Sequence, residues 1–178
     1  MTFRLCLVLL AAAAAAQQRP EWDDLSVFST GVEPPHATFT AYPDAERAAL
    51  GRERSPWYRL LNGNWKFQCS TTPDSRPAGF YRTDYSDVRW NSSPVPSSQE
   101  MHGCGIPIYS NVMYPFPQGP NGEPVVPRRN NAVGSYRTRF TVPPDWQGRL
   151  VFLHFAGVDS AFYVWVNGQK AGYHEDSR

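Results

Sequence analysis

The chain has 178 residues, a length that suits one domain with a sizeable core. Aromatic residues make up 14% of it, and 17 basic residues nearly balance 16 acidic ones. This composition excludes a disordered protein, which needs few aromatic residues and a large net charge. It also argues against a nucleic-acid partner, since no basic cluster stands out to neutralise a run of phosphates.

The N-terminus has the layout of a secretory signal peptide. Arg4 precedes an apolar stretch over residues 5–16, after which the chain turns polar. That stretch is shorter than the roughly 20 residues needed to span a bilayer, and its closing alanines suit a signal peptidase. We expect residues 1–16 to be cleaved, leaving a secreted or periplasmic protein with no membrane segment. The alternative is a buried N-terminal helix or a membrane anchor.

Cleavage would remove Cys6 and leave Cys69 and Cys104. Two cysteines cannot build a disulfide scaffold. They could form one bridge in an oxidising compartment or remain as small buried apolar residues, and the sequence leaves both open.

Residues 17–54 predict an extended N-terminal arm. The stretch is polar and interrupted by prolines, which disfavour helix interiors and central strands. Its aromatic residues follow no helical or strand period, so we expect them to pin the arm to a surface. Only residues 44–52 could form a short helical turn.

Residues 55–178 predict a β-sandwich domain. Residues 64–69 alternate polar and apolar, as a half-buried strand does, with Trp65, Phe67 and Cys69 facing inward. Residues 71–130 predict long connections between short strands at 106–109 and 112–116, and 119–129 is the stretch most expected to be an exposed loop.

The last third has the clearest strand pattern. Residues 136–142 predict a strand with one solvated face that ends at Pro143, and residues 150–155 form a second apolar run. A third run, 161–166, is apolar on both faces and therefore predicted to be central. Asn167-Gly168 suits a two-residue hairpin turn, with residues 169–173 as the returning strand. Short strands, many turns and no long helix predict an all-β antiparallel β-sandwich or jelly roll.

An ordered series of short motifs runs through nearly the whole mature chain. It includes PPHATF from residue 34, LNGNWKF from 61, PVPS from 94, MHG from 101, PIYSNV from 107, YPF from 114, GSYR from 134, GVDSAF from 157, VWVNG from 164 and DSR from 176. The series resembles the N-terminal sugar-binding domain of glycoside hydrolase family 2, specifically the long β-galactosidases.

The resemblance implies a jelly-roll sandwich and hydrolysis of terminal non-reducing β-D-galactose residues with retention of configuration. Retention requires two carboxyl groups about 5 Å apart, as nucleophile and acid/base. In the family both are glutamates on a downstream TIM barrel, where Mg2+ also binds. We therefore expect this chain to be a fragment that is inactive alone, with a β-galactoside as its partner and a homo-oligomer as the full-length assembly.

Two positions of the chain match the family's sugar pocket. Asn131 matches a loop asparagine whose amide can donate to and accept from sugar hydroxyls. Asp176 matches an aspartate that borders the same pocket and helps hold Na+, a hard cation that prefers oxygen ligands. The family's other sodium ligands lie further downstream. Taken without the resemblance, both residues are ordinary turn formers.

The chain departs from the family pattern at two places near these positions. Gln99 and Glu100 stand where a tryptophan and a glutamine are usual, and Ala132 stands where a proline often follows the pocket asparagine. The first change alters the packing of that loop, and the second leaves the backbone less rigid.

Three other kinds of function are weighed beside this one. The chain could be a stand-alone carbohydrate-binding module, a structural region that mediates oligomer contacts, or part of a family 2 β-glucuronidase or β-mannosidase.

Several other residues that could suggest a site are expected to be structural. The four histidines have no metal-ligand spacing. Glu175 and Asp176 are adjacent on an expected strand and so make a poor acid pair. Four aromatic residues that could stack on a sugar are instead expected in the core: Trp65, Phe162, Tyr163 and Trp165.

Overall fold

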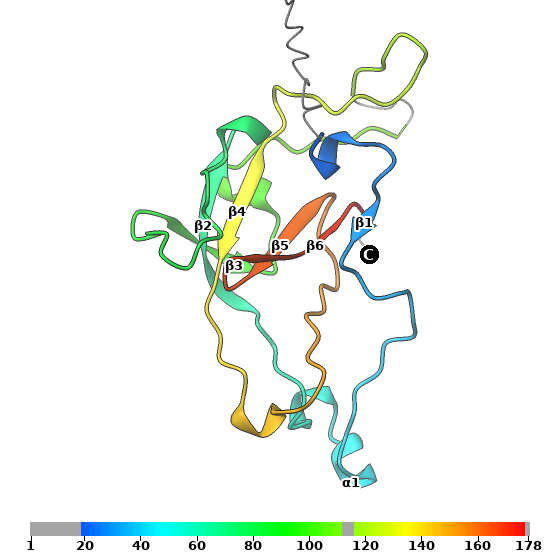
Figure 1. The fold of residues 1–178 in the computed structure, drawn as a ribbon, viewed down its shortest axis with the longest axis vertical. Coiled ribbons are helices and arrows are strands. Elements are labelled where there is room, and N and C mark those ends of the chain that lie inside the picture. The colour runs from blue at the N-terminus through cyan, green and yellow to red at the C-terminus, as the bar shows by residue number, and fades with distance from the viewer. Residues whose placement is uncertain (1–18, 112–115, 177–178) are drawn as a thin grey trace, which may run out of the picture.

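The structure is a computed structural model that describes residues 19–111 and 116–176. The expected signal peptide therefore lies outside the described residues, as does most of the predicted strand at 112–116. The described chain forms two antiparallel sheets of three strands each, in the orders β3-β2-β4 and β1-β6-β5 (Figure 1). The predicted all-β antiparallel sandwich is confirmed. Its jelly-roll topology stays a prediction.

The first sheet is built on β2 (Gly63–Ser70), which lies between β3 (Asn91–Val95) and β4 (Val133–Arg137). Phe67, predicted to face inward, is 4% exposed, and its ring lies 4.8 Å from that of Tyr136 on the paired strand. Sequence patterns missed β3. It contains Pro94, which cannot donate to a ladder, and its place at the sheet edge removes that difficulty.

The second sheet contains the predicted C-terminal hairpin. β5 (Phe162–Val166) and β6 (Gln169–His174) are joined by Asn167 and Gly168, whose φ angles of 50° and 85° confirm the turn. A short β1 (Ser29–Thr30) from the arm adds to the other side of β6. The central position predicted for β5 is therefore wrong among the described strands, because β6 has a neighbour on both sides and β5 has one.

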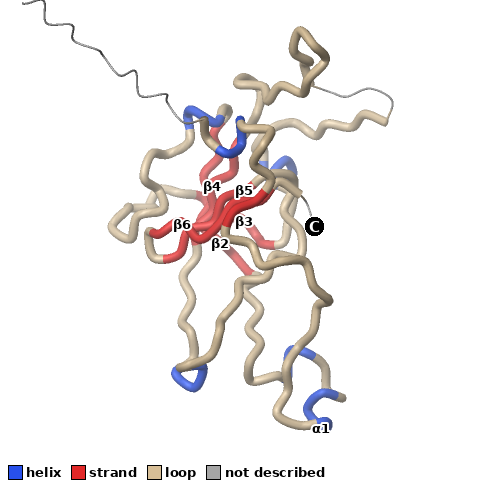
Figure 2. Tube along the Cα trace, turned by 45° about the vertical axis from the view of Figure 1, so that its right-hand side comes forward, coloured by secondary structure: helices blue, strands red, loops and turns tan. Residues whose placement is uncertain are grey.

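Among the residues that the structure describes, helical structure is limited to single turns at the periphery of the sheets (Figure 2). Asp44 caps α1 (Ala45–Ala48) by accepting from the Arg47 amide at 2.7 Å. Over residues 19–111 and 116–176 no helix is long and apolar enough to cross a membrane. The 3-10 turns are η1 (Glu21–Asp23), η2 (Arg52–Arg54), η3 (Pro73–Ser75), η4 (Gln99–His102) and η5 (Pro144–Trp146).

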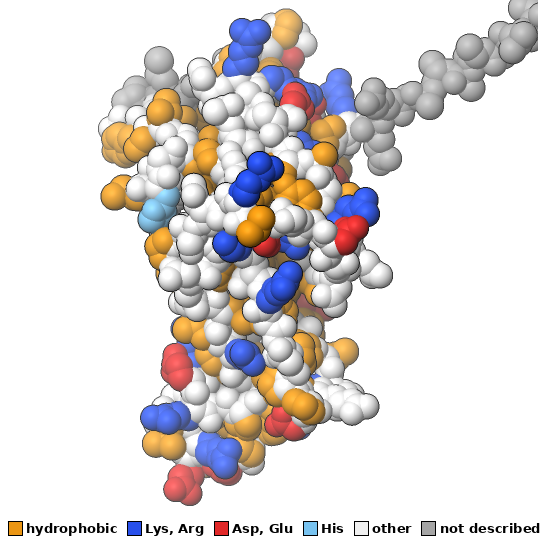
Figure 3. Space-filling model, turned by 90° about the vertical axis from the view of Figure 1, so that its left-hand side faces the viewer, with side chains coloured by type: hydrophobic (Ala, Val, Ile, Leu, Met, Phe, Trp, Pro, Cys, Tyr) orange, Lys and Arg blue, Asp and Glu red, His pale blue; other side chains and the backbone are white. Residues whose placement is uncertain are grey.

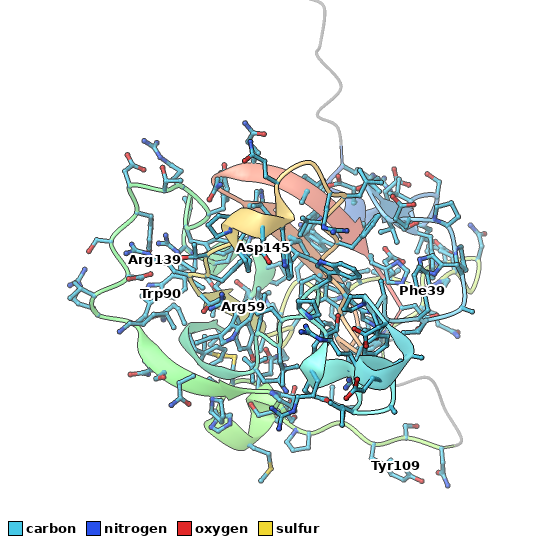
Figure 4. The ribbon with its side chains drawn as sticks, turned by 90° about the horizontal axis from the view of Figure 1, so that it is seen from below. Phe39, Arg59, Trp90, Tyr109, Arg139 and Asp145 are labelled. Carbon is cyan, nitrogen blue, oxygen red and sulfur yellow. A yellow bond between two sulfur atoms is a disulfide. The ribbon has the colours of Figure 1, made fainter. Side chains whose placement is uncertain are left out.

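Three expected strands do not form as predicted. β4 ends at Arg137, so residues 138–142 are irregular, and Phe140 and Val142 are 39% and 44% exposed. Residues 150–155 and 106–109 also lie outside the strands, with Leu150 86% exposed. Tyr109 projects from a loop that runs away from both sheets (Figure 4). An apolar run becomes a strand only with a hydrogen-bonded neighbour, and no described segment pairs with these three.

The buried apolar core is small. It consists of Phe67, Trp90, Cys104 and Tyr173 among the described residues. The four aromatic residues expected in the core are only half-buried, so that prediction overstates their burial. Phe80 lies between β5 and the residue that precedes β3, because its ring is 5.3 Å from that of Trp165 and 6.1 Å from that of Trp90.

Candidate functional site

Asn131 lies two residues before β4, which begins at Val133, and is half-buried. Its side-chain amide nitrogen donates to the carbonyl oxygen of Pro127 at 3.0 Å and so closes the loop onto itself. The left-handed backbone conformation belongs to the preceding residue, Asn130, with a φ of 53°. Asn131 therefore closes this turn, and the hydrogen bond restricts the positions of its side chain.

The loop that carries Asn131 is attached to the N-terminal arm. The Arg128 guanidinium lies 4.6 Å from the centre of the Trp22 ring and bonds to the carboxylate of Asp23 at 2.5 Å. A further carboxylate, that of Asp74, lies 3.8 Å away. Arg128 therefore joins the start of the arm to the segment that precedes β4.

Asp176 follows β6 and is exposed. Its neighbour Glu175 accepts a hydrogen bond from the Tyr173 hydroxyl at 2.5 Å, and Tyr173 is 1% exposed. Burial raises the pKa of the Tyr173 hydroxyl well above its usual range, and the Glu175 carboxylate adds to the effect. Glu175 thus anchors the end of β6, and the exposed Asp176 is the next residue along the chain.

The two predicted site residues lie at the ends of strands in different sheets. Asn131 precedes β4 of the first sheet, and Asp176 follows β6 of the second. Within the described part of the chain, no group of three or more His, Cys, Asp or Glu residues could hold a metal ion. Asp176 supplies one hard oxygen donor, so it fits a sodium site only as one ligand among several.

A disulfide lies beside the loop that carries Asn131. The sequence alone did not decide whether its two cysteines are bonded. Cys69 of β2 is bonded to Cys104, with a Cα–Cα distance of 5.5 Å (the yellow bond in Figure 4). Cys104 is fully buried. The only sequence signal was that two cysteines would remain after the predicted signal cleavage. Their spacing of 35 residues does not by itself indicate a bond.

A surface hollow in the described part of the chain is lined by neither of the predicted site residues. Its volume is about 540 Å3, and it is lined by the loop residues Tyr81, Arg82, Asp84, Tyr85 and Ser86. The Tyr81 ring is stacked on that of Trp165 with an interplanar angle of 10°. The Arg82 guanidinium bonds to both carboxylate oxygens of Asp84 and lowers its pKa. Basic and hydrophobic side chains are interspersed on this side of the molecule (Figure 3).

Comparison with known families gives a match over most of the chain. Residues 58–178 match the family described as "Glycosyl hydrolases family 2, sugar binding domain". The chain belongs to glycosyl hydrolase family 2. The match begins close to the predicted start of the sandwich at residue 55 and includes every strand of the two sheets except β1.

Relatives named "Beta-galactosidase" align with almost the entire chain. The protein of Priestia megaterium is 37% identical over 167 residues, which cover 92% of this chain and 16% of that protein. The Yersinia enterocolitica protein is 40% identical over 164 residues, 90% of this chain and 15% of its own length. The Psychromonas ingrahamii protein is 39% identical over 158 residues, which cover 89% of this chain and 15% of that protein. The chain thus spans about one sixth of the length of these β-galactosidases.

Proposed function

We propose that this chain is the N-terminal part of an exported β-galactosidase that hydrolyses terminal non-reducing β-D-galactose residues with retention. The two glutamates that retention requires belong to a catalytic domain outside the chain, together with its Mg2+. The chain contributes part of the sugar pocket and is inactive alone. The observation that carries the proposal is the alignment of about 90% of the chain with proteins named β-galactosidase.

We propose that Asn131 and Asp176 contribute to one wall of that pocket. The turn bond from Asn131 to Pro127 supports this role, because an amide already held in place loses little freedom when it contacts a sugar. Asp176 supplies a carboxylate to Na+, and the remaining ligands come from outside the chain. Both residues lie at strand ends, and a strand end can present a side chain to a neighbouring domain.

Export is proposed on two independent grounds. The N-terminal sequence has the layout of a signal peptide, and the mature part contains a disulfide. Disulfides persist in oxidising compartments and are rare in the cytosol. A secreted or periplasmic location satisfies both.

The proposal is tested with the chain alone on a chromogenic β-galactoside. We expect no turnover, because the groups that would attack and protonate the glycosidic bond are absent. Turnover that disappears when a residue of this chain is substituted would place catalysis within the chain and overturn the proposal. Translating the reading frame past Arg178 gives an independent check, since it should encode a further domain with both glutamates.

A carbohydrate-binding module is the second candidate, and the hollow beside Tyr81 favours it. Tyr81 is 40% exposed and lies on a stacked aromatic pair, and an aromatic face beside a paired arginine and aspartate suits a sugar ring and its hydroxyls. Titration of the chain with galactosides, monitored by tyrosine and tryptophan fluorescence, tests this candidate. Binding that Tyr81→Ala abolishes and Asn131→Ala leaves intact would favour the module.

A further inference from the structure

The disulfide connects β2, the central strand of the first sheet, to a segment that lies beside the Asn131 loop. Cys69 is the penultimate residue of β2 and pairs with Gly134 of β4. Cys104 lies near the end of segment 98–105, which contains η4. The bond therefore attaches this segment to the sheet at the level where β4 begins.

Local hydrogen bonds shape the attached segment. The amides of Gly103 and Cys104 donate to the carbonyl oxygens of Glu100 and Gln99, each at 3.1 Å, and Gly103 ends η4 with a φ of 78°. These bonds join residues of the same turn. They give the segment its form, and the disulfide gives it a covalent attachment to β2.

The segment packs directly against residues 132–134. A Cβ added to Gly134 would overlap the side-chain oxygen of Gln99, and one added to Gly105 would lie 3.2 Å from the Cβ of Ala132. Burial raises the pKa of Tyr136, and the Glu100 carboxylate raises it further, which is a second sign that η4 lies beside β4. Movement of the segment would therefore remove the packing on one side of the residues that follow Asn131.

We infer that the Cys69–Cys104 disulfide is a positioning device for the sugar-binding loop at Asn131. It holds segment 98–105 against residues 132–134 and so limits the positions that the Asn131 side chain can take. Ala132 restricts its own backbone less than a proline would, so this loop depends more on external support. The inference rests on the proposed role of Asn131 in binding galactose.

Hydrogen exchange measured on the whole chain tests the positioning step without any sugar. In Cys69→Ala/Cys104→Ala we expect exchange at least about tenfold faster over residues 98–105 and 129–134, with the hairpin 162–174 unchanged. Gln99→Ala keeps the disulfide and removes the contact with Gly134, so it should accelerate exchange over 129–134 even if the double variant folds poorly. Unchanged exchange over 129–134 in both variants overturns the inference.

Kinetics of the complete β-galactosidase then test whether the disulfide acts through Asn131. Asn131→Ala and the double cysteine variant should each raise KM by about five- to tenfold with kcat unchanged, the size expected for one lost hydrogen bond. Combining them should raise KM no further than Asn131→Ala alone, since both remove the same contact. If the combined variant raises KM by the product of the two separate increases, the inference is overturned. If Asn131→Ala leaves KM unchanged, the proposed pocket role fails, and the exchange result alone decides whether the disulfide positions the loop.

Discussion

Glu21 and Tyr163 join the beginning of the described chain to its end. The Tyr163 hydroxyl of β5 donates to the Glu21 carboxylate at 2.9 Å across 142 residues of sequence. The Lys170 ammonium of β6 bonds to the other oxygen of the same carboxylate. One acidic residue of the arm thus accepts from both strands of the C-terminal hairpin.

Glu21→Gln should lower the free energy of unfolding by about 1 kcal/mol, because it removes the charge from two hydrogen bonds. It should also speed tryptic cleavage of the arm. Urea unfolding and limited proteolysis measure the two effects. Glu46→Gln is the matched control, since Glu46 is an exposed acidic residue of α1 in the same arm and should change neither quantity. Equal effects of both substitutions would contradict an anchoring role for Glu21.

Tyr163 should make the free energy of unfolding depend on pH in the alkaline range. Burial, followed by the hydrogen bond to Glu21, raises the pKa of Tyr163 from 10.0 to about 12. The folded chain therefore keeps this proton after the unfolded chain has lost it, so the contribution is complete below pH 10 and is lost as the pH rises through 12. Unfolding midpoints measured between pH 9 and 12 should fall more steeply for the native chain than for Tyr163→Phe. Parallel curves would contradict the assignment.

Loss of the Cys69–Cys104 bond should lower the free energy of unfolding by about 3–4 kcal/mol, the entropy released when a loop of this length opens in the unfolded chain. Urea unfolding of Cys69→Ala/Cys104→Ala measures this change. The native chain unfolded in the presence of dithiothreitol should show a similar loss. An unfolding midpoint that dithiothreitol leaves unchanged would show that the bond is absent in solution.

Gly31 follows β1 where the arm approaches β6 most closely. A Cβ there would overlap the carbonyl oxygen of Ala171, and its φ of 67° already disfavours a side chain. We expect Gly31→Ala to destabilise the chain by about 2 kcal/mol or more. Gly122→Ala is the control, because Gly122 has a φ of 81° and no atom within 4 Å of an added Cβ. Its cost should be about 1 kcal/mol. Equal costs in urea unfolding would show that the approach to Ala171 is looser than described.

Local sequence predicted the parts of the fold whose partners are close in the chain. The hairpin of β5 and β6 needs only its own turn, and Asn167-Gly168 supplies the required backbone angles. β2 was found from its alternation. The apolar run at 150–155 failed because a strand also needs a neighbour to complete its hydrogen bonds, and none lies in the described chain. β3 was not predicted because a proline argues against a strand, although an edge strand can contain one.

The candidate site was less accessible to sequence reasoning than the fold. Asn131 and Asp176 were found through family resemblance, since isolated turn residues have no periodicity. The bond from Asn131 to Pro127 and the packing of Gln99 on Gly134 depend on tertiary contacts. The resemblance identified the residues, and the structure added what holds one of them.

Hydrolysis of a chromogenic β-galactoside by the product of the whole reading frame tests the central claim most directly. We expect turnover by that product and none by this chain alone. Asn131→Ala and Asp176→Asn should each raise KM, and a higher Na+ concentration should partly reverse the effect of Asp176→Asn. A full-length product without β-galactosidase activity, or one whose KM both substitutions leave unchanged, would contradict the claim.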